Sequence, residues 1–192
     1  MKRVKRLQGN SIPLNQTELV FESRMIWRNL DNWIREYLIS VNANYGTQAT
    51  AEKKIKASLM ENSNLISLIF GEQDIERYNN LISNFVSTLK ALVAAQIRGD
   101  VNAVNEYTKQ LYANADQRAA FAAEINPFWL ESEWRNLLYQ FLQMTIEEST
   151  TLLKKEYTKS IEIYDDILNL TSKMGDYYSK GVLDYLIYIN QQ

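Results

Sequence analysis

The stretch DIERYNNLISNFVSTLKALVAAQIR, residues 74–98, indicates the fold class of this chain most clearly. Its apolar side chains recur every three or four residues, at Ile75, Tyr78, Leu81, Ile82, Phe85, Leu89, Leu92, Val93 and Ala95. This spacing is typical of an α-helix that buries one face. Gly99 follows directly, and glycine readily takes the left-handed conformation that closes a helix. We therefore predict a long amphipathic helix over residues 74–98.

The same period recurs along most of the chain and predicts further helices over residues 18–42, 100–124, 131–154 and 157–189. Asp100 is expected to cap the helix that it begins, because its carboxylate can accept from backbone amides of the first turn. Shorter helices are predicted over residues 49–60 and 64–70. The fold class that follows is all-α: an up-and-down helical bundle of four long helices with additional shorter helices, ferritin-like in its general architecture.

The composition limits the number of domains and the available chemistry. A chain of 192 residues suffices for one core, and we predict a basic, polar N-terminal arm over residues 1–17 and a single helical-bundle domain over residues 18–192. Without cysteine or histidine the chain has no thiolate nucleophile, no imidazole base and no thiolate or imidazole ligand for a metal. We therefore expect no enzymatic activity and no cofactor.

The charge pattern bears on partners and location. A net charge of −2 argues against specific nucleic-acid binding, which requires a basic face. The four basic residues of the arm, Lys2, Arg3, Lys5 and Arg6, are expected to be solvated or to make a weak contact with an anionic surface. No run approaches the roughly 20 apolar residues of a membrane span, and the arm lacks the apolar centre of a signal peptide. A cytoplasmic protein is expected.

Several motifs carry a resemblance to a known group of proteins. They are Trp27, Trp33, residues 35–40, Phe70-Gly71, Tyr112-Ala113-Asn114-Ala115-Asp116, Ile125-Asn126-Pro127-Phe128-Trp129, Leu142 with Thr145 and Glu148, Met174-Gly175-Asp176, and Gly181-Val182. Together they resemble a widespread family of small helical proteins, found mainly in clostridia and bacilli, that has no established function. The Asn-Ala-Asp and Ile-Asn-Pro motifs are the most specific of them.

The resemblance also implies a degenerate internal site. Members of that family carry histidines at the positions of Leu30, Phe85 and Phe141. Phe141 lies two helical turns before Glu148, in the stretch YQFLQMTIEE, residues 139–148. A histidine and a glutamate seven residues apart share one face of a helix, as in metal sites of helical bundles. Here hydrocarbon replaces the imidazoles, while Glu148 and Asp176 remain. We expect Leu30, Phe85 and Phe141 to lie buried in one layer; the alternative for the two acids is a surface or capped carboxylate.

Two questions stay open at this level. The segments Trp27-Arg28-Asn29-Leu30 and Trp134-Arg135-Asn136-Leu137 match each other, either through an ancient duplication or by chance. The function favoured is a non-enzymatic one, in which the protein acts through protein–protein contacts or self-association as a structural, adaptor or assembly component. The alternative is a metal-binding or small-ligand-binding bundle whose site is degenerate.

Overall fold

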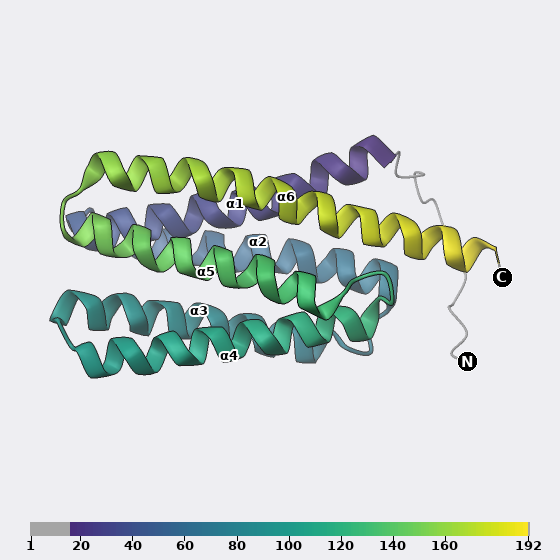
Figure 1. The fold of residues 1–192 in the computed structure, drawn as a ribbon, viewed down its shortest axis with the longest axis horizontal. Coiled ribbons are helices and arrows are strands. Elements are labelled where there is room, and N and C mark those ends of the chain that lie inside the picture. Colours follow the sequence, from purple (N-terminus) through teal and green to yellow (C-terminus); the bar gives the residue numbers. More distant parts are fainter. Residues whose placement is uncertain (1–15, 192) are drawn as a thin grey trace.

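The computed structural model describes residues 16–191, and these form six α-helices (Figure 1). The helices are α1 (Gln16–Ala43), α2 (Gln48–Phe70), α3 (Ile75–Arg98), α4 (Val101–Ile125), α5 (Glu131–Leu153) and α6 (Tyr157–Asn190). No strand occurs between residues 16 and 191. The predicted all-α class is confirmed. The basic residues Lys2, Arg3, Lys5 and Arg6 lie outside the described range.

The six helices pack in chain order around the core, and the last helix contacts the first. Each packs against the next one along the chain, and α6 returns to pack along α1 (Figure 1). Helix α5 also contacts α1 and α3, so that it borders the interior on several sides. The apolar faces of all six helices contribute to one hydrophobic core. No helix of this described part combines the length and the apolar character needed to cross a bilayer.

Helix α2 corrects the prediction of two shorter helices over residues 49–60 and 64–70. It is continuous and 23 residues long. Two of the three polar residues in the predicted gap are buried: Asn62 donates to the hydroxyl of Tyr78 over 2.6 Å, and Ser63 donates to the Asn79 amide oxygen over 3.0 Å. Because α3 supplies partners for the Asn62 amide nitrogen and the Ser63 hydroxyl, these residues do not interrupt the helix. All six helices are long, where four long helices with shorter additions were predicted.

The predicted boundary between α3 and α4 is confirmed. Gly99 takes the left-handed conformation with φ of +67°, and its amide donates to carbonyls of the last turn of α3. The Asp100 carboxylate accepts from the Ala103 amide over 3.0 Å and so caps α4. The short connection makes the two helices antiparallel neighbours.

Two glycines of α6 allow other parts of the chain to approach this helix closely. A Cβ atom at Gly175 would lie 2.6 Å from the Cα atom of Arg24 in α1, and one at Gly181 would lie 2.0 Å from the indole nitrogen of Trp129. Any side chain at either position would collide with its neighbour. The glycines in the Met-Gly-Asp and Gly-Val motifs thus have a packing role.

Candidate functional site

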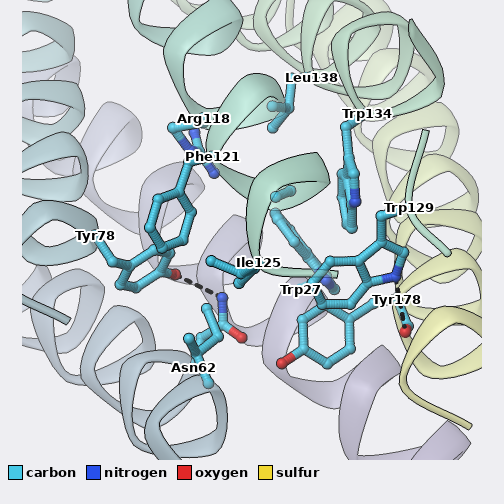
Figure 2. Close-up of a pocket in the computed structure, with 12 residues that line it drawn as sticks. Trp27, Asn62, Tyr78, Arg118, Phe121, Ile125, Trp129, Trp134, Leu138 and Tyr178 are labelled. Atoms are coloured by element: carbon cyan, nitrogen blue, oxygen red, sulfur yellow. Dashed lines mark hydrogen bonds between the residues drawn. The ribbon is translucent and has the colours of Figure 1, made fainter. Parts of the chain in front are cut away.

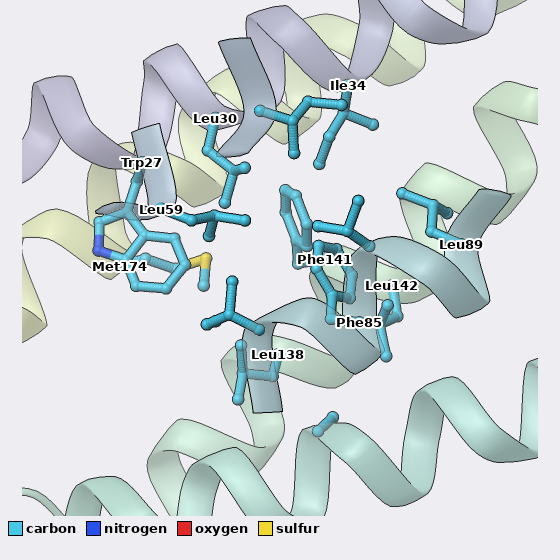
Figure 3. Packing of buried hydrophobic residues seen from close by; sticks show 14 of the residues in the cluster. Trp27, Leu30, Ile34, Leu59, Phe85, Leu89, Leu138, Phe141, Leu142 and Met174 are labelled. Carbon is cyan, nitrogen blue, oxygen red and sulfur yellow. The ribbon is translucent and has the colours of Figure 1, made fainter. Parts of the chain in front are cut away.

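The three apolar residues at the predicted histidine positions lie in the core. Leu30, Phe85 and Phe141 are 2 %, 1 % and 1 % exposed and belong to the same hydrophobic cluster. Figure 3 shows them pointing from three different helices into the interior of the bundle. The prediction that they are buried is confirmed, while their arrangement in one layer stays a prediction.

The two predicted acids lie in different surroundings. Glu148 on α5 is fully buried, and one of its carboxylate oxygens accepts from the guanidinium of Arg35 on α1. Its alternative assignment as a surface carboxylate is wrong. The Asp176 side chain is 46 % exposed and holds Arg24 through two contacts of 2.6 and 2.8 Å. Each acid therefore has its own arginine on α1, and no group of three acidic side chains converges within the described chain.

A third acid, Asp31, is buried in α1 and was not found from the sequence. Neither of its carboxylate oxygens has a hydrogen-bond partner. Burial raises its pKa from 3.8 to about 7, against the opposing charges of Arg35 and Arg28. The signal that could have found it is its position: Asp31 follows Trp27 by four residues and precedes Ile34 by three, on the face that both bury.

The candidate site is a cavity between the helices (Figure 2). The volume of the cavity is about 40 Å³. The empty space rises to about 430 Å³ when the regions open to solvent are included. All six helices and the α4–α5 connection contribute to its wall, through Trp27, Asn62, Ile66, Tyr78, Arg118, Phe121, Ala122, Ile125, Trp129, Trp134, Leu138 and Tyr178. Six of these side chains are aromatic. No sequence motif marked this set, because its members come from every part of the chain.

Three tryptophans form one side of the cavity. The ring centres of Trp27 and Trp134 are 5.7 Å apart, and Trp129 meets Trp134 edge to face at 5.8 Å. Trp27 and Trp134 are the matching residues of the two similar segments noted in the sequence. The two matching tryptophans therefore contact each other in the folded protein. A duplication of the segment stays a prediction.

Trp129 is held by the connection between α4 and α5. Asn126 donates to the Gly181 carbonyl over 3.0 Å and accepts from the Phe128 amide over 3.0 Å. The indole nitrogen of Trp129 donates to the Tyr178 carbonyl over 3.3 Å, and its ring rests on Gly181. The Ile-Asn-Pro motif therefore fixes the tryptophan against α6, and Asn126 is the residue that performs this role.

Several polar atoms at the cavity have no partner in the chain. The indole nitrogen of Trp134, the hydroxyl of Tyr178 and the amide oxygen of Asn62 are all buried without a hydrogen bond. Burial raises the pKa of Tyr178, so its hydroxyl stays protonated and acts as a donor. A buried polar group without a partner is unfavourable, and such groups in proteins are usually satisfied by water or by a ligand.

Arg118 adds a positive charge to the same wall. The residue is 9 % exposed, and its guanidinium lies 5.1 Å from the centre of the Phe85 ring. Burial lowers its pKa from the ordinary value, yet an arginine keeps its proton at neutral pH. No carboxylate within residues 16–191 forms an ion pair with it. Its sequence signal resembles that of Asp31: Arg118 follows Asn114 by four residues and precedes Phe121 by three.

The chain was also compared with known proteins. The comparisons with protein-family models, with curated proteins and with solved structures found no match. The resemblance to the clostridial and bacillar family therefore stays a prediction, and the geometry of the cavity is the basis for assigning a function.

Proposed function

We propose that this chain is a non-enzymatic helical protein that binds a small organic molecule in the cavity lined by Trp27, Trp129 and Trp134. The observation that carries the proposal is the combination of aromatic walls with buried polar atoms that lack partners, the Trp134 indole nitrogen and the Tyr178 hydroxyl above all. Ligand pockets in proteins combine a mostly apolar lining with a few convergent polar groups in this way.

The chemistry of the lining supports binding rather than catalysis. Its polar atoms are indole nitrogens, two phenol hydroxyls, a carboxamide and a guanidinium. These groups donate hydrogen bonds and orient a ligand, but the lining contains no carboxylate that would serve as a general base. The phenol of Tyr178 has a raised pKa and is therefore a poor base as well.

Intrinsic fluorescence provides a direct test. Three of the four tryptophans of the chain line the cavity, so a bound molecule should change the emission of the folded protein. We expect small aromatic compounds of phenol or benzoate size to do so at millimolar or lower concentration. The same compounds should raise the melting temperature, because they bind only the folded state.

A pair of variants on α4 separates cavity binding from surface binding. Ala122 lines the cavity, and Ala122→Met should fill it and abolish the fluorescence response. Ala113 is exposed on the same helix, and Ala113→Met should leave the response unchanged. A compound that binds the Ala122→Met variant as well as the parent protein would show that the cavity is not the site. No response to any compound of the series would refute the proposal.

Self-association is a second proposal, and it has its own observation. Phe128 and Tyr188 pack edge to face at 5.9 Å on the surface and are 38 % and 47 % exposed. Exposed apolar side chains in contact with each other favour a protein interface. Sedimentation over a wide concentration range tests this: replacing both residues by serine should weaken any dimer. A parent protein that stays monomeric at the highest concentration would exclude self-association through this pair.

The ferritin-like metal site remains a proposal that rests on the resemblance alone. The triple variant Leu30→His, Phe85→His and Phe141→His would place histidines at the positions that the resemblance implies. Partial recovery of its melting temperature on addition of zinc, iron or manganese would support the mapping. Melting curves that do not respond to metal would mean that these positions form no site in this scaffold.

A further inference from the structure

We infer that the molecule bound in the aromatic cavity is a small carboxylate, and that its negative charge pairs with the guanidinium of Arg118. This inference rests on the proposed function and adds the chemical class of the ligand. Arg118 borders the cavity from α4, one turn before Phe121 on the same helix (Figure 2). Its charge would therefore be within reach of a molecule held against the aromatic wall.

Arg118 is a buried cation for which the described chain supplies no anion. Removing a charge from water is unfavourable unless an opposite charge or several hydrogen bonds replace the lost hydration. The Phe85 ring, 5.1 Å away, offers a weak attraction to the guanidinium. An aromatic ring alone replaces little of the hydration of a cation. An anion in the adjoining cavity would best replace the rest of the hydration that the Arg118 guanidinium has lost.

Arg35 shows how this protein satisfies an arginine at the edge of the core. Its guanidinium lies 4.3 Å from the centre of the Tyr164 ring, and it also pairs with the fully buried carboxylate of Glu148. Arg35 thus has one aromatic ring and one carboxylate, whereas Arg118 has only the ring. A carboxylate ligand would give Arg118 the same two kinds of partner.

The other unpartnered groups fit an anion as well. The Trp134 indole nitrogen and the Tyr178 hydroxyl are donors that lack an acceptor in the chain. A carboxylate only accepts hydrogen bonds, through two oxygens with about four lone-pair directions. Each of these donors would therefore find an acceptor in a carboxylate that lies against it. A neutral amide or alcohol would leave the charge of Arg118 without a counter-charge.

The size of the cavity narrows the class further. Its volume of about 40 Å³ has room for only a few water molecules, with further space open towards solvent, which favours a compact anion over a nucleotide or a long acyl chain. A planar carboxylate can form two parallel hydrogen bonds with a guanidinium, and a short apolar body can rest on the indole faces of Trp27 and Trp134. A small aliphatic carboxylate meets both conditions, and an aromatic one meets them if its ring extends into the space that opens towards solvent.

The experiment compares each carboxylate with its neutral amide at neutral pH. Acetate is paired with acetamide and benzoate with benzamide, and binding is followed by tryptophan fluorescence and titration calorimetry on the full chain. We expect each carboxylate to bind at least about tenfold more tightly than its amide, because charge-assisted hydrogen bonds are roughly twice as strong as neutral ones. Chloride, nitrate and phosphate serve as inorganic competitors.

Two arginine variants assign the preference to one residue. Arg118→Met keeps much of the length of the side chain without the charge and should reduce the carboxylate preference to about one, while Arg118→Lys should retain part of it. Arg77→Met is the matched control, since Arg77 also lies over a ring, Phe121, but its side chain is 48 % exposed and is paired with Glu124. That control should leave the preference unchanged. If Arg118→Met fails to fold, the carboxylate preference is compared between the parent protein and Arg118→Lys, and an equal affinity of the parent for carboxylates and amides still overturns the inference.

The outcomes separate this inference from the proposed function. Amides that bind as tightly as carboxylates, or a preference that survives Arg118→Met, would overturn the inference and leave ligand binding intact. Binding of inorganic anions without any carboxylate would overturn it too, since the cavity would then recognise charge alone. If neither member of any pair binds, both the inference and the proposed function fall.

Discussion

Replacing Asp31 by asparagine should change how the stability of this protein depends on pH. Asp31 is fully buried in α1, and its pKa is raised from 3.8 to about 7, chiefly by burial and against the attraction of Arg35 and Arg28. A titratable group also acts on it from another helix: Tyr164 of α6, whose own pKa is raised by burial and by the charge of Asp31. Asparagine has nearly the same shape as a protonated aspartic acid but never carries the charge.

The size of the effect follows from the shift in pKa. Between pH 3.8 and about 7 the folded state holds a proton on Asp31 that the unfolded chain has lost. Stability therefore falls as pH rises through this window, and the contribution of Asp31 is constant again above the folded pKa. A shift of about three units at 1.36 kcal/mol each corresponds to about 4 kcal/mol as an upper limit. The parent protein should thus lose up to that amount relative to the Asp31→Asn variant between about pH 4 and pH 8.

Urea unfolding followed by circular dichroism measures this difference at a series of pH values. Subtracting the two free energies of unfolding removes the contributions of all other acids, which both proteins share. Asp166→Asn is the matched control, because Asp166 is exposed on α6, and its difference from the parent should be flat. If the Asp31→Asn difference is also flat from about pH 4 to pH 8, Asp31 is ionised in the folded protein and is held by its arginine neighbours, and the reasoning fails.

Three further changes test the packing. Gly175→Ala should lower the free energy of unfolding by about 1–3 kcal/mol, since its Cβ would meet the backbone of Arg24; an unchanged stability would mean that α1 and α6 separate easily. Phe141→His should cost about 1–3 kcal/mol for the unpaired ring beyond the lost apolar contact, measured by urea unfolding, and a neutral effect would refute its apolar setting. Glu148→Gln should cost about 3 kcal/mol by leaving Arg35 without its charge partner. The double change to Arg35→Met and Glu148→Leu should recover much of that loss, and its failure to do so would exclude the ion pair as the cause.

Much of the fold could be predicted from the sequence because its determinants are local. The apolar period placed the helix over residues 74–98 to within one residue at its start, and Gly99 with Asp100 marked the turn that follows. Burial of Leu30, Phe85 and Phe141 was also predictable, since each lies on the apolar face of its own helix. The gap in α2 was mispredicted because the partner that satisfies Asn62 is Tyr78, a residue of the next helix.

The candidate site could not be found in this way. Its wall combines side chains from Trp27 to Tyr178, and no local pattern states which helices will meet. The same holds for Glu148, whose role depends on Arg35, a residue 113 positions away. Asp31 and Arg118 were open to detection, because each is a charged residue spaced three or four positions from residues that its helix buries. Periodicity alone, however, does not tell whether such a charge will be paired.

The order of residues was enough to establish that this protein is helical, where most of its helices begin and end, and which face of each helix is buried. These properties depend on hydrogen bonds and side-chain spacing within a few residues along the chain. Only the packing of the helices decides that Glu148 is paired with Arg35. The same packing leaves Arg118 at a cavity, without a carboxylate partner in the described chain. The energy of a buried charge depends on what surrounds it in space, and those surroundings exist only once distant helices have packed together.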